Sequence, residues 1–276
     1  MTRSGLISIF MRTGASAIAC LCMAFTAWSA TPDSPASSAA ERGLEIAREA
    51  DHRNAGFGDS TAELSMFLQL SPDEEIERSM RQLTLEVADD GDKSIMVFDR
   101  PRDLNGTAIL TFTHKVGTDD QWLYLPALKR VKRISSADQS GPFMGSEFAY
   151  EDLASQEVEK YRYRYLGDET LDGAVCFVVE RVPVDPKSGY SRLVTWIDQD
   201  EYRLRRIDYY DRKGDLLKTM TLQGYRQYLN AYWRADEMLM INHQSNKRTR
   251  LVFSNYRFRT GLTDQDFSRA ALSRMR

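Results

Sequence analysis

Cysteine is scarce in this sequence of 276 residues, which contains only three: Cys20, Cys22 and Cys176. The first two lie in an N-terminal apolar run. Cys176 lies in a second apolar run, where a buried, unreactive thiol is the expected state. Once the N-terminal run is removed, a single cysteine remains and an intramolecular disulfide is excluded. A hydrophobic core must therefore stabilise the fold.

Histidine is equally scarce, and the three residues His52, His114 and His243 are far apart in the sequence. No HxxxH, HExxH or Cys/His spacing is present, so we predict no metal site. The sequence also lacks a GxSxG motif, a phosphate-binding glycine loop and a dinucleotide fingerprint. We predict a protein without a cofactor and without catalytic residues, that is, not an enzyme.

An excess of charge of one sign is also missing. The chain has 37 basic and 40 acidic residues, which gives a formal net charge of −3. A nucleic-acid-binding domain usually has a strong positive balance, so we expect no nucleic-acid partner.

The N-terminus has no apolar run of membrane-spanning length, which would need about 20 residues. Arg3 and Arg12 instead precede and flank a short apolar segment at 15–28 (ASAIACLCMAFTAW). This pattern predicts a signal peptide over 1–30, cleaved between 29 and 40. A Pro/Ser-rich linker over 31–40 is expected to be disordered, and 41–276 to form a single domain. The mature protein is therefore expected in the periplasm.

The main signal in the rest of the chain is apolar alternation with a period of two. Residues 61–70 (TAELSMFLQL) place five apolar side chains on one face of a strand. Similar segments are separated by turns such as 89–92 (DDGD), which favours antiparallel neighbours. We predict a mainly β (α+β) fold, with a strongly curved antiparallel sheet or incomplete barrel covered by a few helices. Helices are expected at 41–53 and 264–274.

Several predicted strands are apolar on both faces, among them 94–98 and 193–197. A sheet with one solvated face should alternate more cleanly. Two apolar faces require two covers, or one cover and one cavity. The pattern is consistent with a binding hollow and equally with an inner face filled by helices.

The segment 121–153 is the most unusual in the chain, because its loop is apolar. Loops are normally polar since they face water, yet this one carries Phe143, Met144 and Phe148. Such a loop should cover an apolar surface or dock on one. Gly141 and Gly145 would allow it to move as a lid.

Several motifs carry a family resemblance. They are 56–59 (GFGD), 107–110 (TAIL), 122–134 (WLYLPALKRVKRI), 143–153 (FMGSEFAYEDL), 190–192 (YSR), Trp196 and 210–214 (YDRKG). On these motifs, the chain resembles the outer membrane lipoprotein-sorting proteins, relatives of the Lol-type periplasmic lipoprotein carriers, and the resemblance covers about 43–274. The resemblance implies an incomplete barrel with a lipid-holding hollow. It also implies partnership with an inner-membrane exporter of the resistance-nodulation-division type.

The leading hypothesis is a periplasmic carrier for a lipid, a lipoprotein acyl chain or another amphiphile, in trafficking to the outer membrane. The candidate ligand-binding residues, for each of which core packing is the alternative, are Leu64, Met66, Leu68, Leu85, Trp122, Tyr124, Phe143, Met144, Phe148, Trp196, Met238 and Met240. A second hypothesis is an accessory module that docks on the exporter through this loop without lipid cargo. A third is a lipid-modifying hydrolase using His114, His243, Glu147 or Asp152.

A basic segment follows the strand at 121–125. Lys129, Arg130, Lys132 and Arg133 could contact anionic headgroups or an acidic partner. Alternatively, they could protect a solvated edge strand from aggregation.

Overall fold

The structure, a computed structural model, describes residues 35–71 and 73–275. The predicted signal peptide over 1–30 lies outside the described residues. The first helix, α1 (Pro35–Asn54), begins before the expected position at residue 41. The predicted disordered linker over 31–40 is therefore wrong for residues 35–40, which are helical. The small side chains of this stretch are compatible with helix, and Pro35 is placed at its start, where proline is tolerated.

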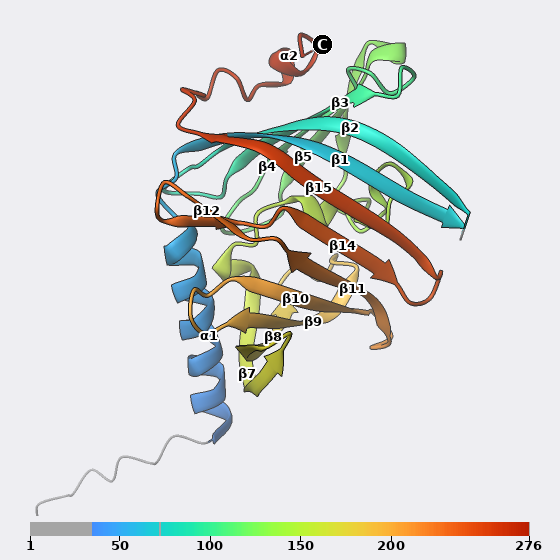
Figure 1. The fold of residues 1–276 in the computed structure, drawn as a ribbon. Helices are drawn as coiled ribbons and strands as arrows, with labels where there is room; N and C mark the ends of the chain where they lie inside the picture. Colours follow the sequence, from blue (N-terminus) through green and yellow to red (C-terminus); the bar gives the residue numbers. More distant parts are fainter. Residues whose placement is uncertain (1–34, 72, 276) are drawn as a thin grey trace, which may run out of the picture. The chain divides into compact units, whose positions relative to one another are not determined.

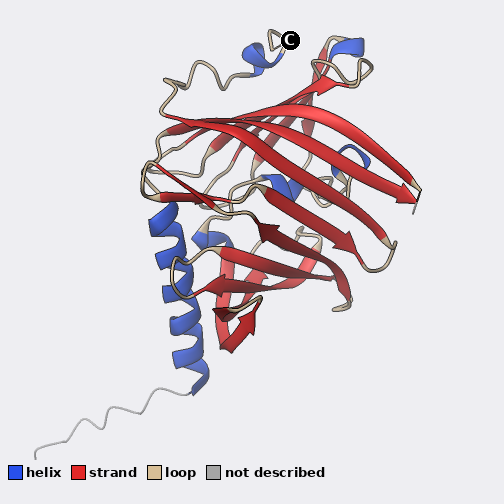
Figure 2. Cartoon of the chain, in the orientation of Figure 1, coloured by secondary structure: helices blue, strands red, loops and turns tan. Residues whose placement is uncertain are grey.

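A single antiparallel sheet of 13 strands makes up most of the described chain, as Figures 1 and 2 show. Its strands lie in the order β6-β5-β4-β3-β2-β1-β15-β14-β11-β10-β9-β8-β7. The bounds are β1 (Asp59–Ser71), β2 (Glu74–Leu85), β3 (Lys93–Arg100), β4 (Ala108–Phe112), β5 (Asp120–Leu125), β6 (Arg130–Ile134), β7 (Tyr161–Leu171), β8 (Ala174–Pro183), β9 (Tyr190–Asp198), β10 (Leu204–Asp211), β11 (Leu216–Gln223), β14 (Glu237–Asn242) and β15 (Lys247–Phe258). The predicted curved antiparallel sheet is confirmed.

Short elements complete the described fold. The strands β12 (Arg226–Tyr228) and β13 (Tyr232–Arg234) form a separate hairpin. The C-terminal helix α2 (Arg269–Leu272) is shorter than the helix predicted over 264–274. Four 3-10 turns are present: η1 (Pro126–Leu128), η2 (Phe143–Gly145), η3 (Tyr150–Leu153) and η4 (Val158–Lys160).

The two edge strands of the sheet are β6 and β7, and they follow one another in the chain. The segment 135–160 joins them, so it must span the opening of the curled sheet (Figure 1). We call the face on which this segment lies the inner face. Period-two alternation assigns each strand residue to the inner or the outer face.

Both faces of the sheet are buried in part, which explains the doubly apolar strands. On the inner face, Ile46 of α1 packs with Phe177, Val179 and Ile197. On the outer face of β3–β5, the C-terminal residues Phe267 and Leu272 cover Ile95, Val97, Ala108, Leu110 and Tyr124. The sheet thus has a cover on each side.

Candidate functional site: a loop held inside the sheet

The largest apolar cluster covers the inner face along the middle of the sheet. Its strand residues include Leu64, Met66 and Leu68 of β1 and Met240 of β14, each no more than 3% exposed. Met238 packs at the margin of the same cluster. All five were predicted as lining residues, and the structure brings them together on one surface.

The segment 141–153 fills the space in front of this surface. Phe143 is fully buried and Phe148 is 2% exposed, and both belong to the inner cluster. The Phe143 ring lies 5.8 Å from that of Phe98 on β3 and 5.5 Å from that of Tyr150, measured between centroids. Met144 packs against the cluster from a partly exposed position. The expected hollow is therefore occupied by the protein's own side chains in this conformation.

Four predicted lining residues lie elsewhere. Leu85, Trp122 and Tyr124 belong to the outer-face cluster beneath the C-terminal segment. Trp196 packs on the outer face with Cys176, Val178 and Val194. Their placement as lining of one hollow is wrong, because strands buried on both faces place alternate residues on opposite sides of the sheet.

A buried ion pair fastens the loop to the sheet. Lys218 of β11 lies among apolar side chains, and its Nζ donates to Asp152 Oδ2 at 2.6 Å and to the Glu147 carbonyl at 2.9 Å. The two charged side chains are 4% and 3% exposed. Tyr190 donates to the other Asp152 oxygen at 2.8 Å. We call Lys218, Asp152 and Tyr190 the latch.

The rings of Tyr190 and Tyr209 surround the Lys218 ammonium group. Lys218 Nζ lies 5.2 Å from the Tyr190 ring centroid and 5.1 Å from that of Tyr209, within cation–π range. Burial raises the pKa of both tyrosines well above the usual value. The phenol hydroxyls of both tyrosines therefore stay protonated, and the Tyr190 hydroxyl remains a donor to Asp152.

Polar contacts from other strands hold the rest of the loop. Arg78 Nη1 of β2 donates to the Met144 carbonyl at 2.6 Å, and the Glu147 amide donates to Thr249 of β15 at 3.0 Å. Asn242 of β14 donates to the Glu147 carboxylate at 2.7 Å. Gln121 of β5 donates to the Tyr150 carbonyl at 2.9 Å. Strands on both sides of the sheet centre thus bind one loop.

Glu151 anchors the loop to the β8–β9 turn. Its carboxylate accepts hydrogen bonds from Ser188 Oγ and the Gly189 amide, both at 2.9 Å. Burial raises its pKa, and the neighbouring charge of Asp152 adds to the rise. A carboxylate in this position is held by two donors, whereas protonation would weaken both contacts.

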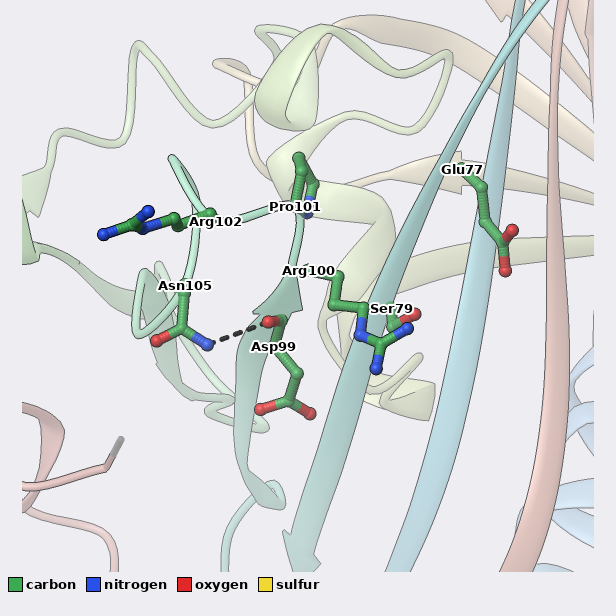
Figure 3. A pocket seen from close by; sticks show the side chains of 7 residues that line it. All are labelled: Glu77, Ser79, Asp99, Arg100, Pro101, Arg102 and Asn105. Atoms are coloured by element: carbon green, nitrogen blue, oxygen red, sulfur yellow. Dashed lines mark hydrogen bonds between the residues drawn. The ribbon is translucent and has the colours of Figure 1, made fainter.

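Two pockets lie near the sheet, and polar residues predominate in both. The first, of about 690 Å³, is lined by Glu77, Ser79, Asp99, Arg100, Pro101, Arg102 and Asn105 (Figure 3). Figure 3 shows that Arg102 points away from Arg100. The Asn105 side-chain amide donates a hydrogen bond to the Asp99 carbonyl at 2.8 Å. The charged groups do not converge on one point. The second, of about 70 Å³, lies beside the latch, with Glu151, Asp152, Tyr190 and Tyr209 in its wall.

The residues proposed for hydrolysis do not lie together in one hydrogen-bonded group. His114 Nδ1 lies 2.7 Å from Asp90, and His243 Nε2 lies 2.9 Å from Thr219. Glu147 and Asp152 are bound within the loop and latch described above. Among the described residues, no group of three or more His, Cys, Asp or Glu is placed to hold a metal ion.

The basic segment forms an edge strand. Arg130, Lys132 and Arg133 lie in β6, which pairs only with β5, and Lys129 precedes it in a left-handed conformation with φ of 49°. All four side chains are exposed. This placement fits the edge-strand alternative, and it also leaves the segment open to a partner.

The latch residue Lys218 was not predicted, although the sequence carries a signal for it. In β11 the inner-face residues are Lys218, Met220 and Leu222. A lysine at an apolar position of an alternating strand requires either exposure or a buried partner. That partner, Asp152, lies far away in the sequence, so the strand alone could not identify it.

Comparison with known proteins identifies the family. A crystal structure from Vibrio parahaemolyticus, described as an outer membrane lipoprotein-sorting protein domain, is 55% identical, with a TM-score of 0.84 over 85% of this chain and 99% of that one. The chain belongs to this family. A DUF1329 family protein from Desulfovibrio piger is 30% identical, with a TM-score of 0.80 over 85% of this chain and 99% of its own.

Other comparisons support the fold. A LolA superfamily protein from Nitrosomonas europaea shares the fold at 21% identity and a TM-score of 0.67, over 83% of this chain and 98% of that one. A family model described only as an uncharacterized protein matches residues 90–274. No curated protein matches the chain. Membership of the lipoprotein-sorting family and the LolA-like fold confirm the predicted resemblance.

No helix within the described part of the chain combines the length and apolarity needed to cross a membrane.

Proposed function

We propose that this protein is a periplasmic carrier that holds an acyl chain of a lipid or lipoprotein on the inner face of its sheet. The observation that supports this proposal most strongly is a continuous apolar inner face covered by a loop that polar contacts attach. Membership of the lipoprotein-sorting family agrees with it. The signal peptide predicted over 1–30 would direct the chain to the periplasm.

Cargo binding requires the loop to leave, because Phe143 and Phe148 occupy the space an acyl chain would take. Their rings would give way to the acyl chain. Gly141 lies at the start of the loop that must move, and Gly145 lies between the two phenylalanines. Gly145 has φ of 78°, a conformation that glycine adopts without strain. The loop thus acts as a substitute ligand in the empty protein.

The magnitudes permit such an exchange. Burying about 15 methylene groups contributes on the order of 12 kcal/mol of gross transfer free energy. Exposing two phenylalanine side chains costs roughly 3–6 kcal/mol. Opening the latch costs a further several kcal/mol, because the two charges must be separated or rehydrated. The opposing terms are of similar size, and a carrier must release its cargo as well as bind it.

Ligand content is the direct test. Protein purified without detergent and examined by native mass spectrometry should show acyl-containing adducts, and delipidated protein should take up a fluorescent fatty acid. Protein that is consistently empty and takes up no probe would refute carriage.

A variant pair assigns any uptake to the inner face. Met240→Glu places a charge on the inner face and should abolish uptake, whereas Ile241→Glu places the same charge on the exposed outer side of the same strand and should leave it unchanged. Equal uptake by both variants would place the ligand elsewhere. Circular dichroism would verify that each variant is folded.

The exporter-docking hypothesis gains no support from the loop. It required Phe143 to be available at the surface, and this side chain is fully buried.

A further inference from the structure

The two edges of the sheet are protected differently. At β7, α1 packs so closely that a Cβ added at Gly43 would lie 2.8 Å from the Tyr165 amide nitrogen. At β6, only β5 pairs with the strand. Apart from the β5 ladder, the structure shows no backbone hydrogen bond for residues 130–134. An uncovered edge of this kind can receive a further strand.

The charges on this edge are largely unpaired. Arg133 pairs with Asp120. For Lys129, Arg130 and Lys132, in contrast, no carboxylate lies within ion-pair distance among the residues that the structure describes. Three free cations within four residues form a positive site along an open backbone.

The side chains of β6 also alternate in kind. Arg130 and Lys132 point to the inner side, as their register with Leu125 and Leu123 of β5 requires. Val131, 38% exposed, points to the outer side opposite Tyr124. A strand added here would meet cations on one of its faces and an apolar neighbour on the other.

We propose that β6 binds an extended acidic segment of a partner protein, which adds to the sheet as a further antiparallel or parallel strand. Carboxylates of the segment would lie beside Arg130 and Lys132, and an apolar residue beside Val131. A membrane surface fits less well, because it would leave the backbone groups of β6 unused. Arg130 and Lys132 are exposed and lie outside the buried inner-face cluster, so binding at this edge does not depend on acyl-chain carriage.

The test uses the full chain and a fluorescein-labelled peptide of nine alternating Glu and Val residues, measured by fluorescence anisotropy at low salt. We expect saturable binding. The double variant Arg130→Glu/Lys132→Glu should weaken binding at least tenfold. The control Lys247→Glu/Arg248→Glu makes the same charge change in the exposed β14–β15 hairpin and should change binding less than twofold.

Backbone pairing is tested by two N-methylated versions of the peptide. Only alternate amides of an added strand face the sheet edge. Methylation of one alternate set should therefore abolish binding, and methylation of the other set should preserve it. Equal binding by both versions, equal loss in the two double variants, or no saturable binding would overturn the proposal. It would also be overturned if Arg130 and Lys132 were needed for binding to phosphatidylglycerol vesicles but not to the peptide.

Discussion

The two faces of the sheet have covers of different chemistry. On the inner face, segment 141–153 contributes apolar rings but is fastened by the buried pair Lys218–Asp152 and by hydrogen bonds from several strands. On the outer face, the C-terminal segment buries Phe267 and Leu272, which are 2% and 0% exposed, and its one ion pair to the sheet among the described residues, Lys93–Asp264, is exposed at Asp264. An exposed ion pair contributes little to stability, so opening it would not release the outer cover. Opening the buried ion pair would release the inner cover, which is therefore the one suited to exchange.

The largest effect is expected at the latch. Lys218→Met leaves Asp152 buried without its cation, which should lower the free energy of unfolding by about 3–5 kcal/mol. Because the loop loses its main attachment, uptake of a fluorescent fatty acid should rise. Urea denaturation and probe titration measure the two effects.

A matched double variant separates the charge from the packing. In Lys218→Met/Asp152→Leu both charges are removed, so most of the lost stability should return. If Lys218→Met alone is as stable as the unchanged protein, the latch does not fasten the loop.

Phenylalanine truncations compare the covers directly. Phe143→Ala and Phe267→Ala each remove a buried ring and should each cost about 3 kcal/mol of unfolding free energy. Only Phe143→Ala should change the affinity for a fatty acid probe, because only that ring occupies the inner face. An equal change of affinity in Phe267→Ala would show that the outer cover also moves.

The β2–β3 turn and the segment 135–160 each contribute an acidic residue, Asp92 and Glu157, and the charge of Glu157 disfavours the ionised form of Asp92. Burial raises the pKa of Asp92 to about 7, and the charge of Glu157 adds to this rise. Since the folded state holds this proton more tightly than the unfolded state, stability falls as pH rises from about 4 to 7. Asp92→Asn should therefore have little effect near pH 4 and stabilise by roughly 1–3 kcal/mol at pH 8. Urea midpoints at both pH values test this, and a stabilisation that is equal at both would contradict it.

The smallest effect is expected at His114, which belongs to neither the inner-face nor the outer-face cluster. Its substitution is also a control for probe uptake. Burial alone would lower its pKa, but hydrogen bonds and charge from Asp90 and Asp120 outweigh burial and raise it. The stabilisation is therefore complete below about pH 6.5 and is lost as pH rises through the raised value. His114→Gln should reduce stability by less than about 1 kcal/mol at pH 5.5. It should leave probe uptake unchanged at every pH, and a change in uptake would tie this network to the inner face.

Much of the sheet could be predicted from the sequence because strand alternation is local. The segment 61–70 became most of β1, and the doubly apolar segments 94–98 and 193–197 lie within β3 and β9. Apolar alternation does not identify the strands β6 and β12. Residues of β6 are too basic to show an apolar face, and β12 has only three residues.

For the candidate site, the apolar sequence of 143–153 was sufficient to predict that this loop covers or docks on an apolar surface. Alternation also grouped Leu64, Met66 and Leu68 correctly. Only the tertiary structure decided which surface the loop covers, that the loop fills it, and that Lys218 meets Asp152 there. Periodicity assigns residues to two faces of a strand but does not say which face becomes the inner one. That choice depends on the curl of the whole sheet and on contacts between residues distant in the chain.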